Sequence, residues 1–141
     1  MKIRKLNIKD AKKISNLLQQ LDYPDTENFI HEKIQSILND PKEYSVVAET
    51  EQHEIVGFIS IHIIPQIALE GDFARISYFC VDENNRSLGI GKLLEEYCEK
   101  IAIENNCDRI EVHCHSRREK AHMFYFRQGY VESPKYLIKK L

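Results

Sequence analysis

The feature that most constrains this fold is a set of three β-rich runs in the middle of the chain, with helical patterns on both sides. Residues 45–49 and 55–63 are separated by the polar turn at 51–54, a spacing typical of an antiparallel hairpin. Pro65 closes the second run, and residues 74–81 form the third. A chain with this centre must form a sheet, and the apolar faces of a sheet need other elements to cover them.

Helical patterns and shorter β-rich runs surround this centre. Apolar side chains recur at helical spacing in four segments, at residues 10–21, 26–38, 91–105 and 119–128. Thr26 is a candidate N-cap of the second segment, and Leu93 is expected to face inward from the third. Further β-rich runs lie at residues 3–6, 109–115 and 136–138. The order β-α-α-β-β-β-α-β-α-β predicts an α/β fold or α+β sandwich, with helices packed on a mixed sheet.

Length and charge limit what else the chain can contain. With 141 residues, 43% of them hydrophobic, it can close one core but not two, so we expect one domain over residues 1–141. The formal net charge of -2 and the lack of a basic stripe argue against nucleic acid and membrane as partners. No signal-peptide pattern and no run of about 18 apolar residues is present, so we expect a cytoplasmic protein.

A glycine-containing loop at residues 86–91 is the strongest chemical motif. Gly89 and Gly91 flank one apolar residue where the third helical segment begins, directly after a strand and a polar loop. Glycine lets the backbone approach a ligand closely, and the amides of a first helical turn attract anions. Arg86 and Lys92 add positive charge, so a pyrophosphate suits the loop, although tight structural turns use glycine too. No dinucleotide fingerprint or P-loop is present.

Two motifs make the resemblance to a family specific. Residues 76–94 are similar to the acetyl-CoA signature of the GNAT superfamily of N-acetyltransferases, whose core is Gln/Arg-x-x-Gly-x-Gly/Ala after a strand ending in valine. Residues 121–130, Ala-His-Met-Phe-Tyr-Phe-Arg-Gln-Gly-Tyr, resemble that family's second segment, and the start of the chain is similar as well. The resemblance implies a mixed, mostly antiparallel central sheet with helices on both faces.

The resemblance also implies a cosubstrate and its binding residues. Acetyl-CoA would be held by the backbone of the third strand and by the loop, at Phe79, Cys80, Val81, Arg86, Ser87, Leu88, Gly89, Ile90, Gly91 and Lys92. The loop amides would bind the pyrophosphate, while the backbone of Phe79 and Val81 would pair with the pantetheine arm. The implied reaction is acetyl transfer from acetyl-CoA to a primary amine.

Tyr125 matches the position of the family's tyrosine acid, which protonates the departing CoA thiolate. Packing between helix and sheet is the alternative role for this aromatic side chain. Arg118 stands three residues before Ala121, where many members have an asparagine that contacts pantetheine, so that contact is open here.

The general base is less clear, because the third strand has no glutamate where the family often has one. Candidates are grouped on the next strand or just upstream of the third: Glu111, His113 and His115, or Glu70 and Asp72. A water chain is an equal alternative. His113 is a weak candidate for the base, because a hydrogen-bonded or exposed strand residue is the simpler interpretation of this histidine.

We expect no metal. The histidines at 113 and 115 lie on the opposite face of their strand from Cys114, and the spacings of the four cysteines, 80, 98, 107 and 114, match no zinc or redox motif. Free thiols are the simpler interpretation.

Two features indicate the acceptor. Residues 118–125 resemble a subgroup of the family with the pattern Arg-x-x-Ala-His-x-Phe-Tyr, which includes small-molecule amine and aminoglycoside acetyltransferases. The other feature is the loop between the first two helices. Its Asp22, Tyr23, Asp25 and Glu27 suit a small cationic amine, although a solvated loop would have the same composition. Two other functions stay open: a protein lysine or N-terminal acetyltransferase, and a non-catalytic CoA-binding regulatory module. A homodimer is compatible with the family, but no residue pattern here tests it.

Overall fold

A five-stranded sheet forms the centre of the protein in the computed structural model, which describes residues 1–133 and 136–141. Its strands lie in chain order, at β1 (Lys2–Lys5), β2 (Glu43–Glu49), β3 (Ile55–Ile64), β4 (Asp72–Val81) and β5 (Cys107–Val112). Neighbours are antiparallel except β4 and β5, which are parallel because a helix crosses between them. The predicted mixed, mostly antiparallel sheet is confirmed.

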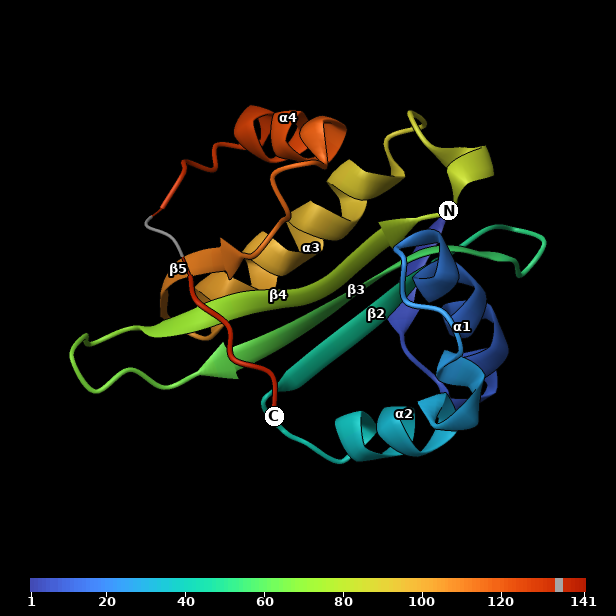
Figure 1. Cartoon of the computed structure of the whole chain (residues 1–141), viewed down its shortest axis with the longest axis horizontal. Helices are drawn as coiled ribbons and strands as arrows, with labels where there is room; N and C mark the ends of the chain where they lie inside the picture. The colour runs from blue at the N-terminus through green and yellow to red at the C-terminus, as the bar shows by residue number, and fades with distance from the viewer. Residues whose placement is uncertain (134–135) are drawn as a thin grey trace.

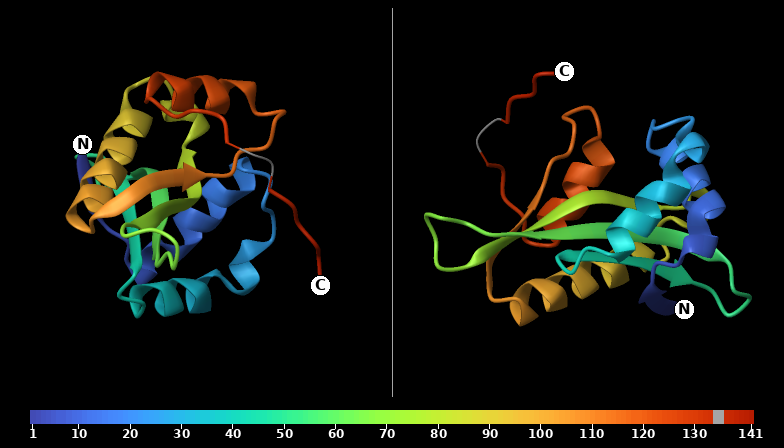
Figure 2. Two further views of the ribbon diagram at one scale, coloured as in Figure 1. Left: turned by 90° about the vertical axis from the view of Figure 1, so that its left-hand side faces the viewer. Right: turned by 90° about the horizontal axis from the view of Figure 1, so that it is seen from below.

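Helices cover both faces of this sheet, as predicted (Figures 1 and 2). One face packs against α1 (Ala11–Gln20) and α2 (Ile30–Leu38). The other packs against α3 (Ile90–Glu104), and α4 (Glu119–Arg127) lies beside the start of α3. Single 3₁₀ turns are η1 (Ile8–Asp10), η2 (Thr26–Asn28) and η3 (Glu83–Asn85). Within the described residues, no helix is both long enough and apolar enough to span a bilayer.

A β-bulge in β4 changes which side chains face which helices. Tyr78 pairs with Ser60 but Ile76 pairs with the next residue, Ile61, so Ser77 is an extra residue in β4. Before the bulge, Ile76 faces α3, whereas after it Cys80 faces α1. The bulge therefore presents Tyr78 on the α1 face of the sheet, near the loop that follows α1.

Three details of the predicted elements were wrong. Thr26 does not cap α2, because it lies in η2 and its hydroxyl is hydrogen-bonded to that of Ser15 at 2.6 Å. Leu93 is 42% exposed, while Leu94 next to it is fully buried. The strand predicted at 109–115 begins earlier and ends at Val112, because β4 pairs no farther than this residue.

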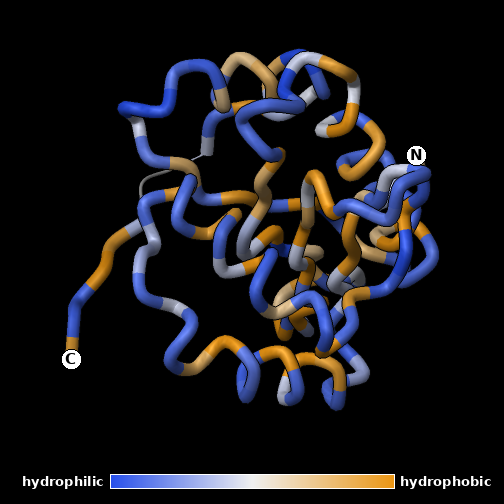
Figure 3. Tube along the Cα trace, turned by 90° about the vertical axis from the view of Figure 1, so that its right-hand side faces the viewer, coloured by the Kyte–Doolittle hydropathy of each residue, from blue (hydrophilic) through white to orange (hydrophobic). Residues whose placement is uncertain are grey.

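The last predicted strand, at residues 136–138, is also absent among the described residues. These side chains are 59%, 91% and 74% exposed, so they do not pack on the sheet. Figure 3 shows the C-terminal end of the chain, with both apolar and hydrophilic stretches, standing away from the rest of the molecule. A β-rich run forms a strand only where a neighbouring strand supplies hydrogen bonds.

Candidate active site

The site lies where β4 and β5 separate. Their pairing ends at Ile76 and Val112, so in the described part of the chain residues 78–81 pair only with β3. The amide of Asp82 donates to Val56 on β3 at 2.8 Å. Because successive residues direct their backbone groups to opposite edges, Phe79 and Val81 direct theirs to the open edge of β4. This edge can accept an extended ligand.

The loop after β4 leads into an uncapped helix end. Gly89 is the N-cap of α3 with φ 81°, and it makes no side-chain capping bond. The first intrahelical bond runs from the amide of Leu93 to the carbonyl of Gly89 at 3.1 Å, so the amides of residues 90–92 have no intrahelical partner. No acidic residue lies in this first turn, all of which the structure describes. The arrangement favours an anion.

The two glycines of the loop serve different purposes. Gly89 occupies the left-handed region, which favours glycine. A Cβ on Gly91 would lie 3.2 Å from the Phe124 ring, so Gly91 allows α4 to pack closely on α3. Ile90 is buried in the core, whereas Leu88 is 70% exposed. Sequence reasoning assigned both glycines to the ligand and could not see the contact with α4.

Cys80, a predicted cofactor residue, directs its backbone groups to β3 and not to the open edge. Its side chain lies on the α1 face, where its thiol donates to the Leu17 carbonyl at 3.4 Å. Burial raises the pKa of this thiol to about 11. Arg86 lies at the edge itself, since its Nε donates to the Val81 carbonyl at 3.3 Å.

Tyr125 lines a cavity of about 50 Å³ at the point of strand separation. Its ring packs against Phe79, Phe124 and Tyr130, with centroids 6.3, 5.4 and 5.3 Å away. Burial raises the pKa of its phenol, so the hydroxyl stays protonated at neutral pH. Tyr125 therefore both packs between aromatic side chains and lines the cavity.

Of the base candidates on and after β5, only His113 lies at this cavity. It is exposed and stacks on Tyr136, with ring centroids 4.3 Å apart. Glu111 is ion-paired with Arg75 at 2.7 Å. His115 is held in a turn, where its Nδ1 accepts from the amide of Arg117 at 3.1 Å.

The upstream candidates, Glu70 and Asp72, are too far away. Asp72 begins β4, and Phe79, which contacts Tyr125, is seven residues along this strand. At roughly 3.3 Å per residue, the separation is about 20 Å.

The loop after α1 closes one side of the cavity. Tyr23 meets Tyr78 edge to face, with centroids 5.3 Å apart, and both line the cavity. Asp22 is paired with Arg117 at 3.2 Å, so its charge is partly compensated. Arg118, which replaces the family's asparagine, also lies in the cavity wall.

Sequence reasoning missed a buried polar pair behind Tyr125. Glu95 on α3 is 1% exposed and accepts a hydrogen bond from the Tyr130 hydroxyl at 3.2 Å. Burial raises the pKa of both groups. The available signal was position, because Glu95 falls on the inward stripe of α3 beside Leu94 and Cys98.

Comparison with known proteins assigns the family. Residues 9–130 match the model of the acetyltransferase (GNAT) family. The chain belongs to this family. It is therefore an acetyl-CoA-dependent acyltransferase, as the two motifs predicted.

Solved structures show the same fold over nearly the whole chain. A transcriptional regulator from Bacillus halodurans superposes with a TM-score of 0.90 at 21% identity, covering 99% of each chain. Glucosamine-6-phosphate N-acetyltransferase from Arabidopsis thaliana gives 0.84 at 23%, covering 99% of this chain and 97% of its own. An aminoglycoside acetyltransferase from an uncultured soil metagenomic sample gives 0.79 at 25%, covering 99% and 95%.

Proposed function

We propose that residues 1–141 form one N-acetyltransferase domain that transfers the acetyl group of acetyl-CoA to the primary amine of a small molecule. The observation that supports this most is that the features of the site follow one another along a single path. The uncapped start of α3 adjoins the open edge of β4, which leads past Phe79 to Tyr125 and its cavity.

The donor would lie along this path. Its pyrophosphate would accept hydrogen bonds from the amides of residues 90–92, with Arg86 and Lys92 exposed nearby. The pantetheine arm would pair with the outward backbone groups of Phe79 and with the amide of Val81, on the edge of β4 beyond the end of its pairing with β5. The thioester would then reach the cavity where the strands separate.

The reaction is direct attack of the amine nitrogen on the thioester carbonyl carbon. The new C–N bond forms, the C–S bond breaks, and the amine loses one proton. A lysine-like amine of pKa about 10.4 is mostly protonated at pH 7, and deprotonating it costs roughly 4–5 kcal/mol. The site must therefore admit a neutral amine and accept its proton.

Tyr125 would donate a proton to the departing CoA thiolate. Its raised pKa keeps the phenol protonated at neutral pH, so a proton is available as the C–S bond breaks and negative charge develops on the sulfur. The proton lost by the amine would leave through solvent or through His113, which lines the same cavity and is exposed. Tyr125 then regains a proton from solvent.

Two features bear on the acceptor. The cavity beside Tyr125 measures about 50 Å³, so it can take the reacting amine group while the rest of the acceptor lies outside it. Among the structural neighbours, two are named for the acetylation of glucosamine 6-phosphate and of aminoglycosides. The acidic loop after α1 gives weaker support for a cationic acceptor than its composition alone indicates. One of its carboxylates, that of Asp22, is already paired with Arg117.

The test is release of free CoA thiol from acetyl-CoA with a panel of small amines, amino sugars and lysine-containing peptides, followed by mass detection of the product. An acetylated small amine supports the proposal. Acetylation of peptides alone would make the protein a lysine or N-terminal acetyltransferase. Thermal stabilisation by acetyl-CoA with no acetylated product from any class would show a binding module instead.

A further inference from the structure

A row of charged side chains crosses the α2 face of the sheet, away from the acetyl-CoA path. Strand register aligns Glu43 on β2, His62 on β3, Arg75 on β4 and Glu111 on β5. Arg75 and Glu111 form an ion pair at 2.7 Å. At the other end of the row, Asp40 joins Glu43 and His62, so the two ends differ in their balance of charge.

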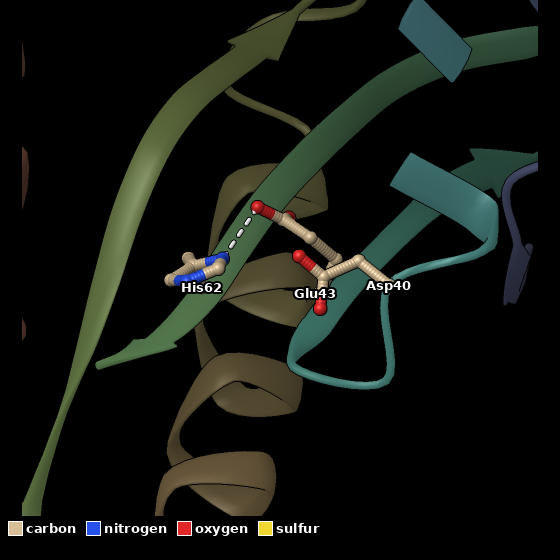
Figure 4. A group of neighbouring side chains, drawn as sticks. All are labelled: Asp40, Glu43 and His62. Atoms are coloured by element: carbon tan, nitrogen blue, oxygen red, sulfur yellow. Dashed lines mark hydrogen bonds and ion pairs between the residues drawn. The ribbon is translucent and has the colours of Figure 1, made fainter. Parts of the chain in front are cut away.

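The Asp40, Glu43 and His62 side chains converge from three parts of the chain (Figure 4). Asp40 lies in the loop between α2 and β2, and one potential ligand atom from each residue lies within 4.8 Å of the others. His62 Nδ1 is 2.7 Å from Glu43 Oε1. These are one imidazole nitrogen and two carboxylate groups, a donor set that suits Zn²⁺ and similar ions.

In the part of the chain described, His62 is the one side chain that forms an ion pair with the carboxylates of this group. Among the ion pairs of the described residues, no lysine or arginine contacts Asp40 or Glu43. A second, independent observation concerns the other carboxylate oxygen. Glu43 Oε2 is buried and has no hydrogen-bond partner in the part of the chain described. A buried carboxylate oxygen without a partner is costly, and a bound cation would supply one.

An ion can reach this group. Asp40 and Glu43 form part of the wall of a cavity of about 470 Å³ between the end of α2 and the start of β2. His62 is about one-third exposed. Water molecules could therefore complete the coordination, as they do in sites with three protein ligands.

We infer that Asp40, Glu43 and His62 bind one divalent transition-metal ion of the zinc type. The nitrogen ligand favours such an ion over Ca²⁺ or Mg²⁺, which prefer oxygen ligands. Because Asp40 follows α2 while Glu43 and His62 belong to the sheet, the ion would fasten the end of α2 to β2 and β3. This inference is independent of the proposed acetyl transfer.

The test is titration of the chelator-treated full chain with Co²⁺, followed by competition with Zn²⁺. We expect one Co²⁺ per chain, with weak visible absorption bands, no thiolate-to-cobalt charge-transfer band, and displacement by Zn²⁺. His62→Gln should weaken binding by more than the roughly 10–100-fold that loss of an outer-shell partner costs. A titration without saturation, or a charge-transfer band that shows thiolate ligation, would overturn the inference.

Two further variants separate metal binding from a simple ion pair. His53 is the matched control, because its Nδ1 also contacts a glutamate, Glu49, at 3.2 Å, but that carboxylate already pairs with Arg4 at 2.6 Å. His53→Gln should leave the titration unchanged. Asp40→Asn should weaken Co²⁺ binding about as much as His62→Gln, while the metal-free protein keeps or gains thermal stability as repulsion of Glu43 is relieved. Equal Co²⁺ affinity in wild type and Asp40→Asn would contradict the site.

Discussion

Replacing Gly89 by alanine tests the loop that begins α3. The new Cβ meets no atom of the described residues within 4 Å, so the whole cost comes from the backbone, at φ 81°. Holding a residue with a side chain in this region costs about 1–2 kcal/mol. Because residues 86–89 are exposed, we expect the free loop to relax to a negative φ and to require this energy again when acetyl-CoA binds. The dissociation constant for acetyl-CoA should rise roughly 5–30-fold.

Gly129→Ala is the matched control for this change. Gly129 has φ 92° and also has no described atom within 4 Å of an added Cβ, so its backbone cost is the same. The backbone at residue 129 cannot relax easily, because the next residue, Tyr130, is held at two points. Its amide donates to the Tyr125 carbonyl at 3.0 Å, and its hydroxyl donates to Glu95 at 3.2 Å. The cost of Gly129→Ala should appear as a loss of about 1–2 kcal/mol in the free energy of unfolding, with unchanged affinity. Isothermal titration measures the affinity for acetyl-CoA, and urea denaturation measures the free energy of unfolding. Wild-type acetyl-CoA affinity in Gly89→Ala would refute the reasoning.

Two further predictions concern buried groups. The pKa of Asp82 is lowered, chiefly because the amide of Asn84 donates a hydrogen bond to its carboxylate. The charged carboxylate therefore stabilises the fold above the unfolded pKa of about 3.9, and this stabilisation is lost as the pH falls through the lower pKa of the folded state. Asp82→Asn should therefore lower the free energy of unfolding at pH 7 by roughly 0.5–1 kcal/mol, and less in acid, as urea denaturation at both pH values would show. Burial raises the pKa of Cys80 to about 11 and that of Cys98 to about 12, so mass analysis after alkylation at pH 8 should find both modified only after unfolding. Early modification of either in the native protein would contradict their burial.

The local features of the site could be predicted from sequence, since they depend on residues close together in the chain. The loop at residues 86–91, the helix after it and the helix with Tyr125 need only periodicity, glycine positions and family resemblance. Pairing between distant strands is different. The end of β5 at Val112 and the lack of a strand at residues 136–138 depend on which backbone groups find partners, and β-propensity does not report this.

The bulge at Ser77 and the charged row show the same limit. One extra residue reverses the faces of every later side chain in β4, so alternation alone could not place the Cys80 side chain on the α1 face. Asp40 and Glu43 are three residues apart, but His62 joins them only through the register of β2 and β3. The expectation of no metal considered the segment from His113 to His115, whereas the proposed metal site lies elsewhere.

Tyr125→Phe removes only the hydroxyl that we propose as the acid in acetyl transfer, so it isolates the role of this group from packing. The variant should be compared with wild type for kcat, for its pH dependence and for the dissociation constant of acetyl-CoA. We predict a fall in kcat of about 100-fold or more, with acetyl-CoA affinity and thermal stability close to wild type. Wild-type kcat with an unchanged pH profile in the folded variant would contradict the account.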